Sequence, residues 1–390
     1  MEPSFSPAVL QWLAEHRTVD PMAVILQKSP FAEVSSKVLA TQLAGMQVAA
    51  AKWPFLLQHP QYLYPSKTSL EQSSSAHTAD YKAGLVNGPK VVDLTGGMGI
   101  DVLHFAQRGQ VVTYVEPNAE LCQLAEYNFK LLGYTIDVEC TTAEQYLAKA
   151  TTYDTIYIDP SRRVEGNKKT GMSNLQPNVV ELQEEMLMMA KQVIIKLSPM
   201  QDLTEVVSTL SNVTSVYVVA VKEEVKELLV ILDGKSTSKQ IAITAVVLGR
   251  GEPVEISSSF GSGVTPVCGE VEQYLYQPHP AAVKANLHDH LAAKSGLTKL
   301  HPNTQLYSSA DYDSEYLGRV YEVQEVVQLR AKTFRKIFGE SHINIISKNH
   351  PLSPSQISKK IGVKQGGSHY LIAATCHDGS KQAYLARRLQ

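Results

Sequence analysis

The stretch that decides the fold of this chain is Val91-Val92-Asp93-Leu94-Thr95-Gly96-Gly97-Met98-Gly99-Ile100-Asp101, in which an apolar strand runs directly into a glycine-rich turn. An amphipathic helix over residues 100–108 follows the turn. Glycines at the end of a strand let the backbone approach a ligand where a Cβ atom would collide. The N-terminus of the next helix offers unpaired N–H groups. The stretch therefore predicts a nucleotide site at the carboxyl end of the first strand of an α/β sheet.

Two acidic residues indicate which nucleotide fits this turn. Asp93 ends the first strand, next to the place where a pyrophosphate would lie, and therefore suits a ligand with a cationic group better. A dinucleotide fingerprint would need a third glycine where this chain has Val102. Glu116 ends the second predicted strand, where a carboxylate accepts hydrogen bonds from both ribose hydroxyls. The alternative, a turn whose glycines serve the backbone alone, is disfavoured by this combination of strand, acids and glycines.

A second candidate site follows the fourth predicted strand, in Asp159-Pro160-Ser161-Arg162-Arg163. Open α/β sheets bind their substrates at the carboxyl ends of the strands. Asp159 can accept a hydrogen bond from a nucleophilic amine or hydroxyl there. Arg162 and Arg163 can clamp a phosphate or stack on a base. The alternative is an Asp-Pro turn with two solvated arginines, and its place in the sheet favours function.

The pattern around these sites is that of a doubly wound sheet, in which short apolar strands alternate with amphipathic helices. Strands are expected at residues 91–94, 111–115, 136–140, 155–158 and 193–197, and an antiparallel pair at residues 216–221 and 228–232 closes the sheet. The fold class is therefore a Rossmann-like α/β domain.

The rest of the chain divides around this domain. Residues 1–85 read as a helical region, and residues 86–235 form the α/β domain. Residues 236–273 are expected to be a linker with strands, including a strand at 241–248 and a Ser/Gly-rich loop at 257–264. Residues 274–320 and 321–390 are two α+β modules.

The bulk composition excludes several classes of protein. The 390 residues are 44% hydrophobic and 19% charged, with a formal net charge of −2. No apolar run reaches the roughly 18 residues of a membrane span, and the first residues do not resemble an export signal. The four cysteines form no CxxC pair and no Cys/His cluster, so neither a metal site nor a disulfide framework is expected. We expect a cytoplasmic protein of unknown oligomeric state that binds no membrane.

Positive charge gathers at the C-terminal end. Residues 330–390 contain eleven Lys and Arg against two acids, a net charge of +9. Such asymmetry is typical of a protein that binds an anionic partner such as a nucleic acid. The alternative is a basic surface that serves solubility alone.

The α/β region resembles the class I S-adenosylmethionine (SAM)-dependent methyltransferases over residues 90–234. The turn at residues 93–99, Glu116 and Asp159-Pro160 look like motifs I, II and IV of that family. The resemblance implies SAM as the cofactor, with its methionine part at the turn and its ribose on Glu116. It also places Thr142 and Ala143 beside the adenine. The implied cofactor-binding set is Asp93, Thr95, Gly97, Gly99, Glu116, Thr142 and Ala143.

More specifically, the chain resembles methyltransferases with a C-terminal THUMP-like domain, some of them similar to trimethylguanosine synthase-like RNA methyltransferases. Residues 70–74 precede the core as a similar segment does there. Residues 278–284 and 300–307 resemble a ferredoxin-like module, and residues 334–375, with Ile343-Asn344-Ile345-Ile346-Ser347-Lys348, resemble the THUMP-like domain. THUMP domains are associated with RNA, which implies RNA as the partner.

The expected activity is SAM-dependent transfer of a methyl group to a nitrogen of an RNA base. Asp159 and the carbonyl of Pro160 would orient that nitrogen, and Arg162 or Arg163 would hold a phosphate or stack on the base. Methyltransferases of exocyclic amines carry a second proline and an aromatic residue where this chain has Ser161 and Arg162. The alternatives are an RNA-binding protein with a degenerate or regulatory SAM site, and a methyltransferase of a small molecule or a protein.

Overall fold

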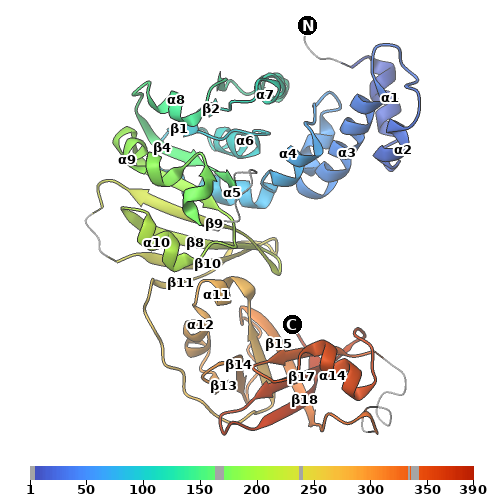
Figure 1. Cartoon of the computed structure of the whole chain (residues 1–390), viewed down its shortest axis with the longest axis vertical. Coiled ribbons are helices and arrows are strands. Elements are labelled where there is room, and N and C mark those ends of the chain that lie inside the picture. Colours follow the sequence, from blue (N-terminus) through green and yellow to red (C-terminus); the bar gives the residue numbers. More distant parts are fainter. Residues whose placement is uncertain (1–4, 163–170, 237–239, 333, 335–341) are drawn as a thin grey trace. The chain divides into compact units, whose positions relative to one another are not determined.

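The computed structural model describes residues 5–162, 171–236, 240–332, 334 and 342–390 (Figure 1). The chain divides into two compact units, which are described one by one. The first comprises residues 1–216 with 227–239, and the second comprises residues 217–226 with 240–390.

The first unit begins with helices, as the sequence predicts for residues 1–85. Four of these helices have a side-chain N-cap that accepts a hydrogen bond from an N–H group of the first turn. The four N-cap residues are Ser6, Asp20, Ser35 and Ser75. The elements are α1 (Pro7–Glu15), α2 (Pro21–Ile25), α3 (Ser36–Lys52), the 3-10 helix η1 (Pro54–Gln58), α4 (Lys67–Gln72) and α5 (Ala76–Leu85).

A sheet of mainly parallel strands follows. Seven of its nine strands are β1 (Lys90–Asp93), β2 (Val111–Val115), β3 (Asp137–Glu139), β4 (Tyr153–Ile158), β7 (Ala190–Leu197), β8 (Val213–Val221) and β9 (Glu224–Asp233), in the spatial order β8-β9-β7-β4-β1-β2-β3. β1 pairs in parallel with both β2 and β4, and the register sets Asp93 opposite Tyr114 and Tyr157. β9 runs antiparallel to β7. The Rossmann-like sheet with an antiparallel end is therefore confirmed.

Helices connect these strands and cover the sheet. They are α6 (Ile100–Gln107), α7 (Ala119–Leu131), α8 (Ala143–Leu147), α9 (Val179–Met189) and α10 (Leu203–Thr209), and a short 3-10 turn η2 (Met172–Asn174) and the two-residue strands β5 (Ser161–Arg162) and β6 (Leu175–Gln176) lie between β4 and α9. Figure 1 shows α6 on one side of β1 and β4 and α9 on the other. Asn118 caps α7, as expected, by accepting from the N–H groups of Glu120 and Leu121. The carboxyl ends of the parallel strands are thereby left as the open edge of the sheet.

The second unit contains an antiparallel hairpin, β10 (Ala242–Leu248) and β11 (Val254–Ser259), and a seven-stranded sheet. The expectation of a loop at residues 257–264 is wrong in its first part, because Ser257–Ser259 belong to β11. Thr244 Oγ1 lies 2.8 Å from Ser257 Oγ, so hydroxyl pairing across the strands compensates for the low strand propensity of serine.

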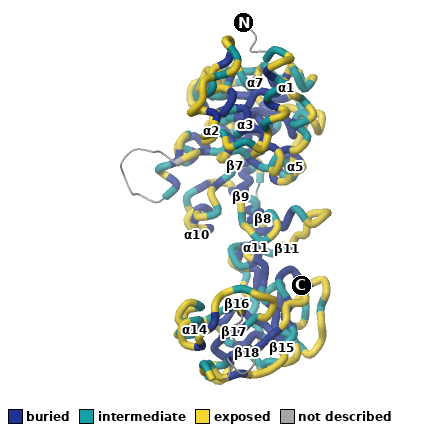
Figure 2. The backbone as a smooth tube through the Cα atoms, turned by 90° about the vertical axis from the view of Figure 1, so that its right-hand side faces the viewer, coloured by how far each residue is buried: buried dark blue, intermediate teal, exposed yellow. Residues whose placement is uncertain are grey.

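The seven-stranded sheet has the order β13-β14-β12-β15-β18-β17-β16. Its strands are β12 (Tyr274–Pro278), β13 (Thr298–His301), β14 (Thr304–Ser309), β15 (Gly318–Val326), β16 (Asn344–Lys348), β17 (His369–Thr375) and β18 (Lys381–Arg388), with helices α11 (Pro280–Lys284), α12 (His288–Lys294) and α14 (Pro354–Ile361). Leu371 and Ala373 on β17 pack with Ile357 and Ile361 of α14 on one face of the sheet. Ile372 and Ala374 pack on the other face with Leu306. β17 is therefore buried on both faces, as Figure 2 shows in dark blue.

Within the described part of the chain, the helices are all too short or too polar to cross a membrane.

Candidate active site

The glycine-rich turn after β1 is shaped by the side chain of Tyr114 and by left-handed backbone at two glycines. A Cβ atom on Gly96 would lie 2.2 Å from the ring of Tyr114, so only glycine fits there. Gly97 and Gly99 have φ of 53° and 82°, in the left-handed region that glycine adopts without strain. The Tyr114 hydroxyl donates to the carbonyl of Gly97 over 2.7 Å. Among the residues that the structure describes, a Cβ on Gly97 would find only the Thr95 carbonyl within 4 Å, at 3.8 Å, so space for a ligand remains beside it.

Asp93 holds this turn from inside the protein. Its Oδ1 accepts from the N–H of Thr95 over 2.8 Å and from the Thr95 hydroxyl over 3.2 Å. Thr95 Oγ1 in turn accepts the N–H of Asp159 over 2.7 Å, which joins the turn after β1 to the end of β4. Asp93 is 1% exposed. Burial, and then the negative charge of Asp101, raise the pKa of Asp93 to about 8.

This raised pKa predicts a pH-dependent contribution to stability. Between pH about 4, where an unfolded Asp ionises, and pH about 8, only the folded state keeps the proton. The free energy of unfolding therefore falls as pH rises, by up to about 1.4 kcal/mol per pH unit from this group. Asp93→Asn cannot ionise and is expected to lose less stability than the wild type between pH 5 and 7.5 in denaturant titrations. Parallel losses in the two proteins would contradict the assignment.

Glu116 lies after β2, where it bridges two backbone groups. Oε2 accepts from the N–H of Gly97 over 3.0 Å, and Oε1 accepts from the N–H of Asn118 over 2.9 Å. Each carboxylate oxygen has a further lone pair. The carboxylate is therefore fixed beside the glycine turn with acceptor capacity left for a pair of hydroxyls.

Thr142 and Ala143 begin α8 at the end of β3, along the same edge of the sheet. The Thr142 side chain caps α8 by accepting from the N–H of Gln145, and Ala143 is buried. The N–H of Glu116 donates to the carbonyl of Glu139, which brings the ends of β2 and β3 together. The structure therefore gathers the expected cofactor-binding residues along the ends of β1, β2 and β3.

Asp159 lies at the end of β4 and forms an ion pair with Lys196 of β7. The two side chains are 31% and 15% exposed, so the pair faces partly outward. Burial opposes the charge of Lys196, but the carboxylate of Asp159, followed by those of Glu227 and Asp101, outweighs it and raises the lysine pKa. Lys196 is therefore an ammonium group beside the expected catalytic carboxylate.

The remaining expected site residues of this segment are Pro160, Arg162 and Arg163. Pro160 is buried, and the backbone of Arg162 pairs with Leu175 in the short ladder of β5 and β6. Arg163 lies outside the described residues.

A buried cluster of charged side chains joins the elements that carry the glycine turn. Lys82 of α5 is fully buried and pairs with Asp101 over 2.7 Å and with Glu227 over 3.6 Å. Its ammonium also donates to the Ser74 hydroxyl over 2.5 Å and to the Tyr157 hydroxyl over 3.2 Å. Burial raises the pKa of Asp101, but the charges of Lys82 and Lys196 outweigh it, and the pKa lies below its ordinary value. The cluster thus links α5, α6, β4 and β9 beneath the turn.

Sequence reasoning missed the lysines of this site. Lys196 had one signal, because it interrupts the apolar run of β7, Val193–Leu197. Lys82 had none, because a lysine on a short helix is ordinarily solvated.

The comparison with solved structures bears on the whole chain. A protein of Porphyromonas gingivalis W83 that is assigned as a methyltransferase matches it with a TM-score of 0.87 and 31% sequence identity, over 98% of both chains. The chain belongs to this methyltransferase family. Residues 274–316 match a ferredoxin-like domain family and residues 318–388 match a THUMP domain-like family. The resemblance to class I methyltransferases with a THUMP-like domain is therefore confirmed.

More distant structures match only part of this chain. A SAM-dependent methyltransferase of Agrobacterium tumefaciens is 16% identical, with a TM-score of 0.30, over 46% of this chain and 58% of that one. A tRNA (uracil-54, C5)-methyltransferase of Pyrococcus abyssi, solved with S-adenosyl-L-homocysteine, is 17% identical, with a TM-score of 0.28, over 45% of this chain and 41% of that one. Likenesses this low say nothing about the activity of the chain. None of the curated proteins matches it in sequence.

SAM is the cofactor of class I methyltransferases, and the edge of this methyltransferase sheet suits it. The open space beside Gly97 admits a ligand, and the fixed carboxylate of Glu116 suits a ribose. Among the described residues, no group of three or more His, Cys, Asp or Glu is placed to hold a metal ion.

Proposed function

We propose that the chain is a SAM-dependent methyltransferase that acts on RNA, with a nitrogen of an RNA base as the acceptor. The observation that carries the proposal is the bond between the Asp159 N–H and Thr95 Oγ1. It fixes the backbone of Asp159, which carries the expected catalytic carboxylate, beside the turn that would hold the cofactor. Positioning of this kind is the main contribution that a protein makes to methyl transfer.

The residues divide the work along the edge of the sheet. The turn with Asp93, Thr95, Gly97 and Gly99 would hold the methionine part of SAM, Glu116 its ribose, and Thr142 and Ala143 its adenine. Bound SAM supplies an electrophilic methyl group on a sulfonium. Asp159 accepts a hydrogen bond from the attacking N–H through the oxygen that Lys196 leaves free, and the carbonyl of Pro160 accepts a second. Arg162 or Arg163 would hold the RNA.

A hydroxyl of RNA is the second candidate acceptor, and the ion pair between Lys196 and Asp159 favours it. An attacking hydroxyl would lose its proton to the free carboxylate oxygen of Asp159 as the new O–C bond forms and the S–CH3 bond breaks, and an ammonium next to it stabilises the negative charge that develops on oxygen. A neutral nitrogen instead gains positive charge, which an adjacent ammonium opposes.

The assignment of RNA rests on the THUMP domain-like match and on the net charge of +9 over residues 330–390. A cytoplasmic location belongs to the same proposal, since RNA substrates are found there.

Transfer from methyl-labelled SAM to RNA tests the proposal, with the RNA taken from cells that lack this protein. Digestion of the labelled RNA to nucleosides then separates base-methylated from ribose-methylated products. Label on a base nitrogen supports the first acceptor, and label on a ribose hydroxyl supports the second. Label on proteins or small molecules alone would contradict the RNA assignment. SAM binding without any transfer would favour a regulatory site.

A further inference from the structure

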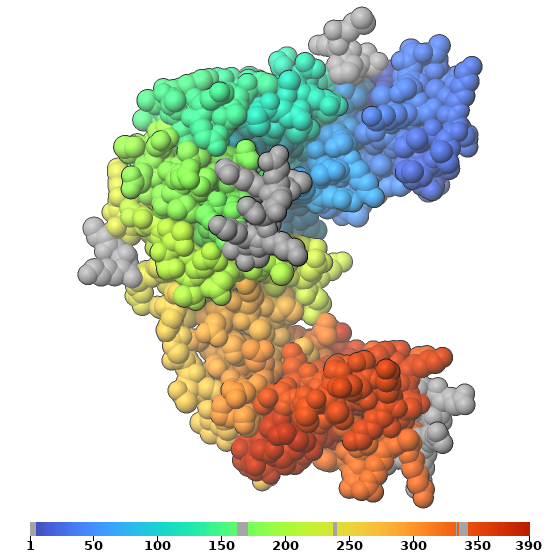
Figure 3. Space-filling view, viewed as in Figure 1, coloured from blue at the N-terminus to red at the C-terminus, as the bar shows by residue number. Residues whose placement is uncertain are grey.

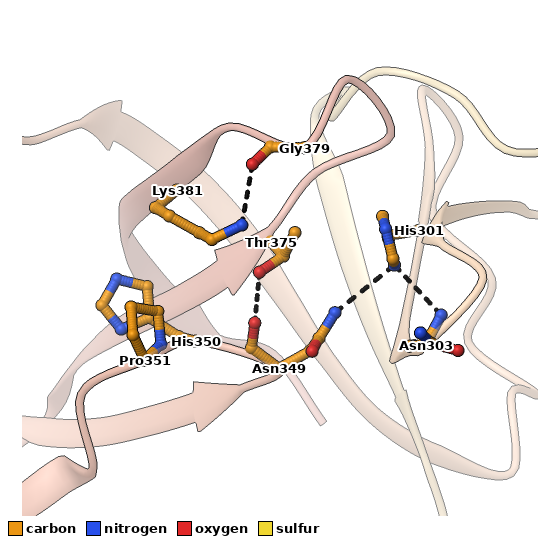
Figure 4. A pocket seen from close by; sticks show the side chains of 8 residues that line it. All are labelled: His301, Asn303, Asn349, His350, Pro351, Thr375, Gly379 and Lys381. Carbon is orange, nitrogen blue, oxygen red and sulfur yellow. Dashed lines mark hydrogen bonds between the residues drawn. The ribbon is translucent and has the colours of Figure 1, made fainter.

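The second unit contains a pocket of about 450 Å³ whose lining includes none of the residues of the expected site of methyl transfer. Three turns meet there, as Figure 4 shows. The turn between β13 and β14 contributes His301 and Asn303, and the segment after β16 contributes Asn349, His350 and Pro351. The end of β17 and the turn to β18 contribute Thr375, Gly379 and Lys381. The pocket therefore joins the ferredoxin-like module to the THUMP-like module.

A chain of hydrogen bonds holds these turns together. The Thr375 hydroxyl donates to the carbonyl of Asn349. The Asn349 amide then donates to Thr304 Oγ1 over 3.2 Å and contacts His301 Nδ1 at 3.3 Å. Thr304 is buried and donates to the carbonyl of Thr375 over 2.9 Å. Asn349 has a φ of 50°, in the left-handed region that Asn tolerates better than most residues. The geometry of the pocket is thus set before any ligand arrives.

The groups that the pocket offers are mainly hydrogen-bond donors. The N–H of Asn303 donates to His301 Nδ1 over 3.1 Å, so the neutral ring carries its proton on Nε2 and can donate from there. Lys381 Nζ donates one hydrogen to the Gly379 carbonyl over 2.7 Å, which leaves two. The eight described residues of the lining include no Asp or Glu. The nearest carboxylate in sequence, Asp378, accepts from the N–H of Ser380 over 2.9 Å.

These observations favour a backbone phosphate of a nucleic acid over a small-molecule anion as the ligand. Small-molecule sites bury most of their ligand, whereas Asn303, Asn349 and Lys381 are exposed. A backbone phosphate of a strand that crosses the surface needs only such an open cradle. Figure 3 shows that the orange segment near residue 300 and the red C-terminal segment meet on one surface of this unit. Residues 330–390, which include that red segment, have eleven Lys and Arg against two acids.

We propose that the pocket lined by His301, Asn303, Asn349, His350 and Lys381 binds a backbone phosphate of the RNA substrate. The proposal rests on the RNA assignment above. It adds the place where the ferredoxin-like and THUMP-like modules together contact the RNA backbone. Backbone contacts of this kind fix the register of the RNA and carry no sequence preference.

The test compares two lysines of the same module. Lys381→Gln removes the ammonium of the pocket, and Lys359→Gln removes an exposed ammonium from α14, so the net charge changes equally. Binding of a fluorescent oligouridylate is measured over a range of salt concentrations with the full chain. For Lys381→Gln we expect affinity at low salt to fall about tenfold, and the slope of log K against log salt to fall by about 0.7, as for one lost single-strand contact. For Lys359→Gln we expect a smaller change in both.

A second variant separates the pocket from general charge. His301→Phe removes the Nε2 donor without removing a full charge, so it is expected to weaken binding severalfold while the salt slope stays nearly constant. Equal effects of Lys381→Gln and Lys359→Gln would overturn the proposal, as would RNA binding that neither pocket variant changes. Binding of inorganic phosphate that Lys381→Gln abolishes, with RNA binding unaltered, would assign the pocket to a free anion instead.

SAM titration of the same variants keeps the two proposals apart. The pocket variants are expected to bind SAM as the wild type does. A wild type that binds SAM but no oligouridylate overturns the pocket and leaves the methyltransferase assignment standing.

Discussion

Asp159→Asn is expected to lower the rate of methyl transfer by about 10²–10⁴-fold, the range typical of a positioned acid–base group. The amide cannot accept a proton and offers one oxygen where the carboxylate offers two. Its backbone N–H still donates to Thr95, so the glycine turn is retained. The affinity for SAM is therefore expected to change little, which calorimetry and single-turnover transfer from labelled SAM measure separately.

Asp154→Asn provides the matched control. Asp154 lies near the other end of β4 and also pairs with a lysine, Lys191, over 2.7 Å. Its loss changes the charge of the same strand equally, and we expect transfer within about twofold of the wild type because surface pairs contribute little. Comparable losses in the two variants, or a fall in SAM affinity that accounts for the lost rate, would contradict a role of Asp159 in the transfer itself.

Lys82→Met is expected to lower the free energy of unfolding of the first unit by about 3–5 kcal/mol, because it leaves buried carboxylates without their cation. Asp101 loses its 2.7 Å partner and Glu227 loses its 3.6 Å partner. Both Trp residues of the chain, Trp12 and Trp53, belong to this unit. Urea titration followed by tryptophan fluorescence therefore reports on the first unit alone.

Two further variants make this prediction specific. Lys67→Met breaks an ion pair with Glu71 whose side chains are 77% and 64% exposed, and it is expected to cost less than about 1 kcal/mol. Adding Glu227→Gln to Lys82→Met removes one stranded charge and is expected to restore part of the loss. A Lys82→Met protein as stable as Lys67→Met would mean that the buried cluster does not hold the unit together.

The sheet and its cofactor edge could be predicted because they depend on local patterns. Strand, glycine turn and helix follow one another over residues 91–107. The acid Glu116 directly follows β2, so the parallel sheet places it at the same end as the glycine turn. The need for glycine at position 96 is apparent only in the structure, because it comes from the ring of Tyr114 on β2. The strand at Ser257–Ser259 could not be predicted, because hydroxyl pairing with β10 overrides the turn preference of serine.

The charged partners could not be predicted because they come from distant parts of the chain. Lys196 meets Asp159 across 37 positions, and Lys82 meets Tyr157 across 75. Burial of an ammonium is exceptional for lysine, and it becomes favourable only when the fold supplies carboxylates from several elements. The pocket at His301 and Lys381 has the same origin, since hydrogen bonds from Asn349 to Thr304 and from Thr304 to Thr375 join turns that lie far apart in the sequence.

The measurement that tests the central claim most directly is calorimetric titration of SAM into the wild type, Glu116→Ala and Glu126→Ala. Glu126 is an exposed acid on α7 and pairs with Lys130, so its loss changes the net charge equally. Micromolar binding of SAM is expected for the wild type and for Glu126→Ala. For Glu116→Ala we expect the affinity to fall by about two orders of magnitude, because the two charge-assisted hydrogen bonds from the ribose hydroxyls to Glu116 are lost. A folded wild type that does not bind SAM would contradict the account.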